Sequence, residues 1–481
     1  MAQFRRQTVK HYYKIFIILI SLFSVTLAWA VPPPSGVPII TQKQNALLGK
    51  KLMQEIRRQG VVIDDPIIQN YLQTLGQKLL AHTNSSLKTF HFFVLNDSTI
   101  NAFAMPGGYI GVNSGLIFAT SNESELAAVL AHEIAHITQH HMERLLEQVD
   151  NINIPATAAL MAALLLGSTS GSAATANAAT GAAMAVMAGS TQHLLNFTRS
   201  NEAEADRMGM QTLYSAGFDP EAMPNFFEQM QRENLDYDNR LPPFLLTHPV
   251  TGTRIAESRD KAELYPHQSL PPSLTYALVK ARMQVLTIRE KFRAISHFKA
   301  LLNSNTNQNA TRYGYALALY EDRKLAPAQT NIDLLLTKNH EIIYLLLKAQ
   351  IAAEHDPSMA LNLLQPALST NTQYYPLIIQ YGETLLNNHQ AEAAKIFLAK
   401  YADSYTDNIL FQQLFGDVQA KAHALPEAYL ARAKVYEMEG YNQPALTLLE
   451  QALKLPQLSG NTRTKINAKI SELKALMTQN Q

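Results

Sequence analysis

Residues 121–149, SNESELAAVLAHEIAHITQHHMERLLEQV, constrain the fold of this chain more than any other stretch. Ser121 and Asn122 are candidate N-caps, and acidic side chains follow in the first turn. Apolar side chains then recur at helical spacing, at Leu126, Val129, Leu130, Ile134, Ile137, Leu145 and Val149. The pattern predicts one long helix with a buried face.

This segment contains the pattern H-E-x-x-H, formed by His132, Glu133 and His136. Residues four apart lie on one helix face, so both imidazoles can reach a single ion. Imidazole nitrogen suits zinc, and two histidines leave room for a third ligand and a water. Glu133 is turned by roughly 100° around the helix and can take the proton of that water during attack on a peptide carbonyl. The pattern predicts peptide-bond hydrolysis; the alternative is a pair of solvated histidines. His140 and His141 are expected at the surface or behind the ligands.

A second segment, residues 196–218 (NFTRSNEAEADRMGMQTLYSAGF), offers the third ligand. Glu202 and Asp206 are four residues apart and share a face of the predicted helix, and Gly217 marks its end. We assign Glu202 as the third metal ligand and Asp206 as the acceptor of a ligand histidine N–H, which fixes the tautomer. Glu204 is expected to face solvent. The alternative for Glu202 is an ordinary surface acid.

Together with NAFAMPGGYIGVNSGLI at residues 101–117, these motifs resemble those of the M48 class of zinc metallopeptidases. The resemblance implies a zincin-like (gluzincin) catalytic domain of the α+β class, mostly helical with a small sheet. It also implies one zinc ion per chain. The similarity runs from about residue 40 to the C-terminus, with specific motifs in the protease half and a looser match in the second half.

The first thirty residues have the organisation of a secretion signal. An apolar run, residues 15–30, ends in the A-x-A site Ala28-Trp29-Ala30 and follows four basic residues, Arg5, Arg6, Lys10 and Lys14. We expect export and cleavage after Ala30. The alternative is an uncleaved anchor, although the run is short for a membrane-spanning helix of about 20 residues.

Composition narrows the functional classes. The chain has no cysteine, which excludes disulfides, lipidation at cysteine, thiol ligands and thiol nucleophiles. The chain has 40 Lys and Arg against 39 Asp and Glu, and loss of the four basic residues of the signal leaves a net charge of about −3. A nucleic acid partner is not expected at this balance.

Helical periodicity predicts two helices before the catalytic motifs, over residues 40–58 and 65–82. Residues 90–96 (FHFFVLN) and the stretch NAFAMPGGYIGV are instead β-branched and aromatic with turn signals, which predicts a small sheet. An edge strand beside a zinc site can bind an extended peptide by main-chain hydrogen bonds. The resemblance places that role on Asn101, Ala102, Phe103 and Ala104; the alternative is that these residues only build the core.

Residues 154–192 form a segment rich in Ala, Gly, Ser, Thr and Met between His136 and Glu202. Its longest apolar run, residues 156–166, has about half of the roughly 20 residues needed to cross a membrane. We expect two short helices on a mobile hairpin near the active site, which shield the cleft or touch a membrane surface or an apolar client. Packing against the core is the alternative.

A turn bounded by proline, residues 247–249, follows the active-site motifs, and a helix is expected to begin near Thr251. In the resembled family the matching histidine can occupy the position of the water and hold the enzyme inactive. The resemblance thus implies a regulatory fourth ligand at His248; a capping or packing histidine is the alternative. It also places Arg254 near the site as a candidate donor to a carbonyl or oxyanion.

From about residue 272 the sequence repeats in helix-length pieces. Alanines recur 34, 32 and 34 residues apart, each with a large apolar residue four positions later: Ala294 and Phe298, Ala328 and Ile332, Ala360 and Leu364, Ala394 and Leu398. The last copy, residues 429–456, is close to the tetratricopeptide pattern, with Arg432 where Leu is usual. The gap of 51 from Ala394 to Ala445 indicates an irregular half-repeat. Because small residues let paired helices approach, this half is predicted to be an all-α tetratricopeptide-repeat solenoid with a concave surface for partners.

The sequence predicts a signal peptide at residues 1–30, a zinc endopeptidase domain at 31–271 and a repeat domain at 272–481 that recruits clients or a complex. The resemblance implies a periplasmic protein that cleaves unfolded, stalled or misassembled outer-membrane proteins, assists their assembly, and has the barrel-assembly machinery as its partner. One alternative is a periplasmic chaperone or scaffold whose metal is structural or resting. Another is a scavenger of small peptides. Peripheral membrane contact stays open.

Overall fold

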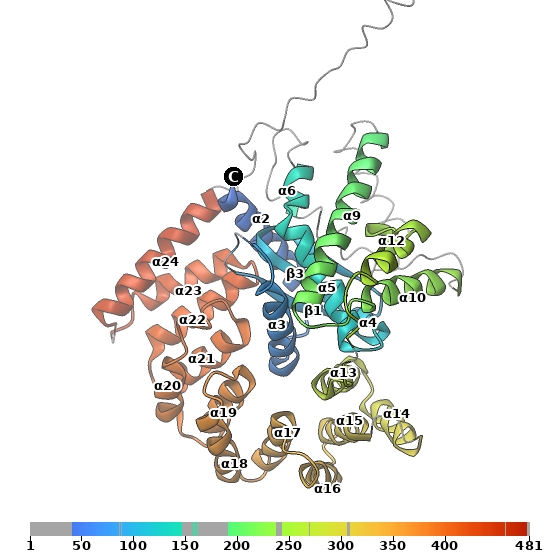
Figure 1. The fold of residues 1–481 in the computed structure, drawn as a ribbon. Coiled ribbons are helices and arrows are strands. Elements are labelled where there is room, and N and C mark those ends of the chain that lie inside the picture. Colours follow the sequence, from blue (N-terminus) through green and yellow to red (C-terminus); the bar gives the residue numbers. More distant parts are fainter. Residues whose placement is uncertain are drawn as a thin grey trace, which may run out of the picture. The chain divides into compact units, whose positions relative to one another are not determined.

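The computed structural model describes residues 41–85, 87, 89–146, 157–158, 161, 191–236, 243–268, 270–304, 308–456 and 458–478. The chain from Gln42 onward forms one compact unit. Its described residues are mostly helical and include a three-stranded sheet (Figure 1). The predicted class, a mainly helical α+β catalytic part followed by helical repeats, is confirmed.

Two helices open the described chain close to their predicted ranges, α2 (Gln42–Arg58) and α3 (Pro66–Leu80). The start of α3 is fixed by Asp65, whose Oδ1 accepts hydrogen bonds from the backbone N–H groups of Ile67 and Ile68. A proline at the first helical position adds a preset backbone angle without losing a hydrogen bond. The apolar face of α3 is buried against the catalytic core.

The predicted sheet is present and has the strand order β1-β3-β2. Strand β1 pairs with β3 in parallel, and β2 pairs with β3 antiparallel, so β2 lies at an edge. The strands, the short 3-10 turn between the last two and the helix that follows them are β1 (His91–Leu95), β2 (Ala102–Met105), η1 (Pro106–Gly108), β3 (Tyr109–Asn113) and α4 (Ser114–Ala119).

The edge at β1 is closed by other parts of the chain. The side chain of Gln73 donates to the carbonyl of Phe90 at 3.0 Å, just before β1. The segment 61–63 runs along the far end, where the N–H of Ile63 donates to the carbonyl of Val94 at 2.9 Å. Covering an edge in this way prevents another strand from pairing there. Within the part of the chain that the structure describes, no strand pairs with the outer edge of β2.

The stretch for which one long helix was predicted contains two, α5 (Glu123–Thr138) and α6 (His141–Leu146). The side chain of Asn122 caps α5 by accepting from the N–H of Glu125 at 3.0 Å. The prediction of a single helix is wrong because His140 adopts the left-handed conformation, with φ of 57°. This break turns α6 and brings His141 toward the H-E-x-x-H face.

Among the described residues, four more helices follow in the catalytic half: α9 (Thr191–Ser215), α10 (Ala222–Asp236), α11 (Pro243–Thr247) and α12 (Gly252–Ala262). Helix α9 packs along α5 at close range through Gly209, where a Cβ would lie 3.1 Å from the backbone nitrogen of His132. Gly217, in the left-handed conformation with φ of 78°, follows its end as predicted. Thr251 caps α12, as expected from its position.

The repeats are α13 (Leu274–Thr287), α14 (Lys291–Asn303), α15 (Gln308–Glu321), α16 (Leu325–Leu336), α17 (Ile342–Ala353), α18 (Pro357–Thr370), α19 (Tyr375–Asn387), α20 (Ala391–Ala399), α21 (Ile409–Lys421), α22 (Leu425–Met438), α23 (Asn442–Ala452) and α24 (Gly460–Thr478). The recurring alanines and their large partners are all at most 1% exposed, which confirms the periodicity: Ala294, Phe298, Ala328, Ile332, Ala360, Leu364, Ala394 and Leu398. Helix α21 is the extra half-repeat (Figure 1).

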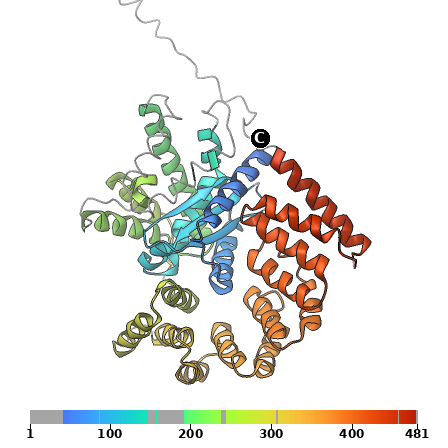
Figure 2. The ribbon, with the colours of Figure 1, turned by 180° about the vertical axis from the view of Figure 1, so that it is seen from behind.

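Buried or partly buried charged contacts join the repeat helices to the catalytic half near the start and near the end of the repeats. Near their start, Arg282 on α13 forms a buried ion pair with Asp65, the N-cap of α3, at 2.7 Å. Near their end, Glu437 on α22 accepts from Lys50 on α2 at 2.6 Å, and its carbonyl accepts from Gln54 at 2.6 Å. Figure 2 shows α2 lying beside these last helices. The position of the catalytic half is thus tied to both ends of the repeats.

The described helices include none with the length and apolar character needed to span a membrane. The predicted signal peptide, residues 1–30 with cleavage after Ala30, lies outside the described residues. So does the segment 154–192, apart from residues 157, 158, 161 and the first two residues of α9.

Candidate metal centre

Three predicted ligands converge between α5 and α9. His132 and His136 lie one turn apart on α5, and their Nε2 atoms are 3.0 Å apart. Glu202 comes from α9, with carboxylate oxygens 3.5 Å from His132 Nε2 and 3.3 Å from His136 Nε2. His132 and Glu202 are buried, whereas the side chain of His136 is 14% exposed. The three predicted ligands come from two helices, two from α5 and one from α9, and the fold brings them together.

His248 joins this group from the turn after α11. Its Nδ1 lies 3.2 Å from His132 Nε2 and 3.0 Å from a carboxylate oxygen of Glu202. One donor atom from each of the four side chains lies within 4.8 Å of the other three. The turn is held locally, because the N–H of His248 donates to the carbonyl of Phe244 at 2.7 Å and the two rings pack 5.1 Å apart.

The donor set fits zinc in its chemistry and its spacing. Zinc binds imidazole nitrogen and carboxylate oxygen at about 2.0–2.2 Å, which puts tetrahedral ligand atoms about 3.4 Å apart. The separations of 3.0–3.5 Å among His132, His136 and Glu202 agree with that value. The group of three with His248 as a fourth donor therefore suits a tetrahedral metal ion.

Glu133 lies beside this group with an unsatisfied carboxylate. The residue is completely buried, and within the described residues neither of its oxygens has a hydrogen bond. Nε2 of His248 lies 3.4 Å from its Oε1, outside hydrogen-bonding geometry. A buried carboxylate without a donor is costly unless a proton donor reaches it. Such a group is what a general base requires.

Asp206 and Arg254 hold the ligands from behind. Asp206 Oδ1 lies 3.1 Å from Nδ1 of His132, the ring nitrogen that faces away from the ligand group. Arg254 binds both oxygens of Asp206 at 2.7 Å and reaches Glu202 at 3.0 Å and the carbonyl of Pro249 at 2.8 Å. All three guanidinium nitrogens thus have protein acceptors. This arrangement favours a positioning role for Arg254 over the expected role as a donor to a substrate oxyanion.

The charges of the site are set by burial and by close partners. Burial alone would raise the pKa of Glu202, but His248, His132 and His136 hold it well below its usual value. Burial likewise opposes ionisation of Asp206, yet hydrogen bonds from His132 and Arg254 lower its pKa. Burial lowers the pKa of His136 to about 3, which keeps the ring neutral and able to bind a metal.

His132 behaves differently from His136. Burial favours its neutral form, but hydrogen bonds to Asp206 and Glu202 outweigh burial and raise its pKa to about 10. Arg254 compensates the charge of one of these carboxylates. A divalent cation would compensate the charge of Glu202. The charges of the site are therefore consistent with metal binding by this group of donors.

A second network lies behind His136, where His141 takes one of its two expected positions, whereas the parts of Glu204 and Arg144 in it were not expected. Nδ1 of His141 lies 2.8 Å from Nδ1 of His136, and its other nitrogen lies 3.2 Å from Glu204. Arg144 donates to the same oxygen of Glu204 at 2.8 Å. Glu204 is therefore only partly open to solvent, as its side chain is 30% exposed and paired on two sides.

The predicted edge-strand residues lie next to the ligands. Phe103 and Ala104 of β2 line a cavity together with Glu133, His136 and Glu202. Asn101 and Ala102 are buried at the start of the strand. The carbonyl of Ile100, just before them, accepts from the N–H of Phe244 on α11 at 3.2 Å. The helix before His248 is thus hydrogen-bonded to the chain at the start of the edge strand β2.

Comparison with known proteins agrees with this geometry. The model of peptidase family M48, whose members use zinc, matches residues 66–262. The beta-barrel assembly-enhancing protease of Escherichia coli (strain K12) is 31% identical over 438 residues, 90% of this chain and 88% of that protein. A Vibrio cholerae protein provisionally given the same name is 34% identical over 444 residues, 90% of each chain.

A more distant relative matches a smaller part of the chain. The mitochondrial metalloendopeptidase OMA1 of Schizosaccharomyces pombe is 30% identical over 193 residues, 38% of this chain and 50% of that protein. The full-length similarity to the bacterial proteases covers the catalytic residues and the repeats alike. The chain is a zinc metallopeptidase that belongs to peptidase family M48, alongside the beta-barrel assembly-enhancing proteases.

Proposed function

We propose that this protein is a periplasmic endopeptidase that cleaves unfolded, stalled or misassembled outer-membrane proteins and assists their assembly. One observation carries the catalytic part of the proposal: His132, His136 and Glu202 meet beside the buried carboxylate of Glu133, which has no hydrogen bond within the described residues. A structural zinc site needs no such carboxylate beside it.

Each polar residue of the site has a distinct task in this account. Zinc, when bound by His132, His136 and Glu202, supplies Lewis-acid activation of a water and of a peptide carbonyl. Glu133 accepts the proton of the attacking water and returns it to the leaving nitrogen. Asp206 orients the ring of His132 and is itself held by Arg254, which keeps the ligands in place.

The substrate main chain is proposed to pair with the free edge of β2. Ala102–Met105 pairs with β3 on one side only, while the opposite edge of the sheet is closed at β1. An extended peptide added there runs past Glu133 and His136, because Phe103 and Ala104 share a cavity wall with them. Only an unfolded segment can add itself as a strand, which suits clients that have failed to assemble.

His248 is proposed to hold a resting state. Its Nδ1 faces the ligand group as a fourth donor, and its Nε2 lies 3.4 Å from the carboxylate of Glu133. With His248 in this position a metal site has four protein donors, and the open position required for catalysis is closed. Activity then requires movement of residues 247–249 away from the site.

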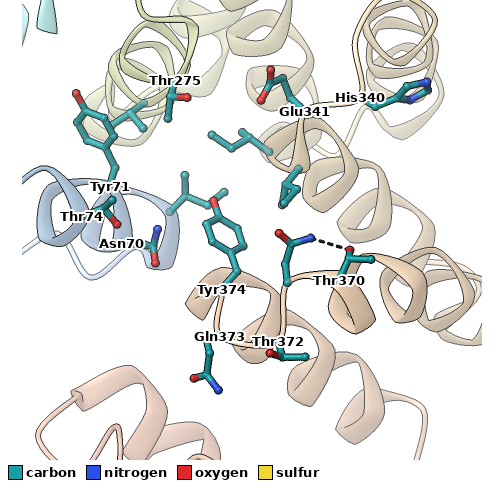
Figure 3. A pocket seen from close by; sticks show the side chains of 15 residues that line it. Asn70, Tyr71, Thr74, Thr275, His340, Glu341, Thr370, Thr372, Gln373 and Tyr374 are labelled. Atoms are coloured by element: carbon teal, nitrogen blue, oxygen red, sulfur yellow. Dashed lines mark hydrogen bonds between the residues drawn. The ribbon is translucent and has the colours of Figure 1, made fainter. Parts of the chain in front are cut away.

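The repeats are proposed to recruit the client or the barrel-assembly machinery. The bacterial relatives are named for enhancing beta-barrel assembly, and the shared length includes the repeats. A cavity of about 840 Å³ lies between α3 and the repeat helices. Its lining mixes apolar side chains with amide and hydroxyl groups, which include Asn70, Thr74, Thr275 and Gln373 (Figure 3). Such groups can hydrogen-bond the main chain of an extended polypeptide regardless of its sequence.

The division of the chain follows from this function. We propose a signal peptide at residues 1–30 that is removed after Ala30, a catalytic domain at 31–271 and a repeat domain at 272–481. The segment 154–192 lies between the two ligand helices in sequence and is proposed to shield the cleft or to touch a membrane or client. The one alternative that the structure favours is a scaffold at rest, because His248 closes the donor set.

Replacement of the base tests the proposal. Glu133→Gln should retain one zinc per chain and its melting temperature but lose cleavage of an unfolded outer-membrane barrel protein. Glu257→Gln, an exposed carboxylate on α12, is the matched control and should cleave normally. Zinc-dependent cleavage by Glu133→Gln at the rate of the parent protein contradicts the assigned base. Full complementation of a deletion strain by Glu133→Gln would favour the scaffold, and cleavage of short peptides alone would favour a peptide scavenger.

A further inference from the structure

His141 is a buried imidazole with a polar contact at each of its ring nitrogens. It is the first residue of α6, and 5% of its surface is exposed. Its Nδ1 lies 2.8 Å from Nδ1 of the predicted ligand His136. Its Nε2 lies 3.2 Å from a carboxylate oxygen of Glu204. Each ring nitrogen thus has a partner at hydrogen-bonding distance, and each contact requires one proton between its two atoms.

The protons in these two contacts can be assigned from their outer ends. Nε2 of His136 faces His132 and Glu202 and offers its lone pair to the metal. A neutral His136 therefore carries its proton on Nδ1. At the other end, the carboxylate of Glu204 only accepts, so the proton of His141 lies on Nε2. Nδ1 of His141 is left with a lone pair, which accepts from His136.

The outer end of this series of contacts is held by a cation. Arg144 donates to the same oxygen of Glu204 at 2.8 Å and to the amide oxygen of Asn201 at 3.2 Å. The side chain of Glu204 is 30% exposed, whereas that of His141 is 5% exposed. The series therefore runs from the buried ligand group toward the surface, where Arg144 balances the charge of the carboxylate.

The two histidine ligands are supported by similar series of groups. His132 contacts Asp206 at 3.1 Å, and Asp206 in turn binds an arginine of α12. His136 contacts His141 instead, and a carboxylate of α9 and an arginine of α6 follow. The second series is longer by one imidazole, so His136 donates to a neutral acceptor rather than to a carboxylate. Partners of this kind fix the tautomer and the ring orientation of a ligand histidine.

We propose that His141 is a positioning residue of the zinc site, which accepts the Nδ1–H of His136 and so fixes the tautomer and the plane of that ligand. Glu204 and Arg144 hold the ring of His141 in the orientation that this contact requires. The proposal rests on the proposed peptidase function and adds a residue to its zinc site. The other role open to His141 is that of an anchor for α6, which requires only its contact with Glu204.

Two substitutions of His141 separate these roles, because each keeps one of the two contacts. The amide of asparagine lies close to the position of Nδ1, so His141→Asn keeps an acceptor for His136 and loses the contact with Glu204. The longer amide of glutamine reaches the position of Nε2, so His141→Gln keeps the contact with Glu204 and loses the acceptor. A positioning role and an anchoring role therefore predict opposite orders of zinc affinity for the two variants.

Zinc affinity is measured by competition with a chelator, beside the free energy of unfolding of the zinc-free protein. His141→Gln should bind zinc about 10–100-fold more weakly than the wild type, the usual loss when the partner of a ligand histidine is removed. His141→Asn should recover most of this loss. His140→Asn is the matched control and should bind zinc normally, because its side chain is 53% exposed and asparagine tolerates the left-handed backbone there. A loss in His141→Asn as large as that in His141→Gln, or larger, overturns the proposal.

Glu204→Ala tests the outer contact at a partly exposed residue. It should lower zinc affinity by about threefold or more in the wild type, because His141 is no longer held. It should have little effect in His141→Asn, which has already lost this contact. No loss in the wild type, or an equal loss in both backgrounds, also overturns the proposal, since Glu204 would then not act through His141. All affinities are measured without peptide, so the predicted order in a protein that cleaves nothing contradicts the proposed hydrolysis alone.

Discussion

Arg254 and Asp206 form a buried ion pair with two parallel contacts, each of 2.7 Å, between the guanidinium Nε and Nη2 and the two carboxylate oxygens. Asp206 in turn lies 3.1 Å from Nδ1 of His132. The contacts therefore run from the metal ligand His132 to Asp206 and on to Arg254, which lies on α12, a helix without a metal ligand. The orientation of His132 therefore depends on a residue 122 positions away in the sequence.

Arg254→Met is expected to weaken zinc binding and the fold together. The substitution leaves the carboxylate of Asp206 and one side of Glu202 buried without a cation, which costs about 3–5 kcal/mol. Loss of support for a ligand typically lowers metal affinity by about 10–100-fold. Zinc affinity by competition with a chelator and the free energy of unfolding check both effects. Arg259→Met on the same helix, whose partners Glu221 and Glu228 are partly exposed, should change neither by a comparable amount.

His248→Ala is expected to raise the rate of peptide hydrolysis. The variant removes the fourth donor and frees the neighbouring carboxylate of Glu133. The gain reflects how rarely the wild-type turn is open, and it reaches about tenfold if the open form is about a tenth of the population. Initial rates at saturating zinc measure it, with His267→Ala, an exposed histidine, as the control. An unchanged or lower rate would contradict the proposed role of His248 in a resting state.

Glu437→Gln is expected to destabilise the protein at neutral pH and not in acid. Burial alone would raise the pKa of Glu437, but Lys50 and Lys469 lower it below its usual value of 4.5. A carboxylate with a lowered pKa contributes stability above about pH 4.5, and this stability is lost as the pH falls through its folded-state pKa. The variant should lose about 1–3 kcal/mol at neutral pH, because charge-assisted hydrogen bonds are replaced.

Urea unfolding of both proteins at neutral pH and in steps below about pH 4.5 measures this difference. Glu392→Gln, an exposed side chain paired with Lys395 one turn away, is the control and should stay within about 0.5 kcal/mol of the wild type. A constant difference across the whole pH range would mean that Glu437 acts through packing rather than charge.

Local patterns in the sequence predicted the elements that carry the site. The i, i+4 spacing of His132 and His136 and of Glu202 and Asp206 depends only on helix geometry, and α5 and α9 are helices at those positions. The repeat periodicity was equally local, because each recurring alanine is buried within a repeat of paired helices. Such features depend on a few neighbouring residues and can be predicted from a single sequence.

The contacts that sequence reasoning missed depend on departures from regular geometry. On a continuous helix His141 would be turned about 140° away from His136, and only the left-handed backbone of His140 brings the two rings together. A histidine can adopt that conformation, but nothing in its identity requires it. The pairing of Glu204 with His141 and Arg144 follows from the same break, so it was hidden as well.

The position of a zinc ion tests the central claim most directly. Crystals of the zinc-loaded protein, measured at the zinc absorption edge, should give one anomalous peak per chain at about 2.0–2.2 Å from His132 Nε2, His136 Nε2 and a carboxylate oxygen of Glu202. A peak elsewhere, or one at which Glu202 lies outside bonding distance, would contradict the assignment of these three residues as the metal ligands.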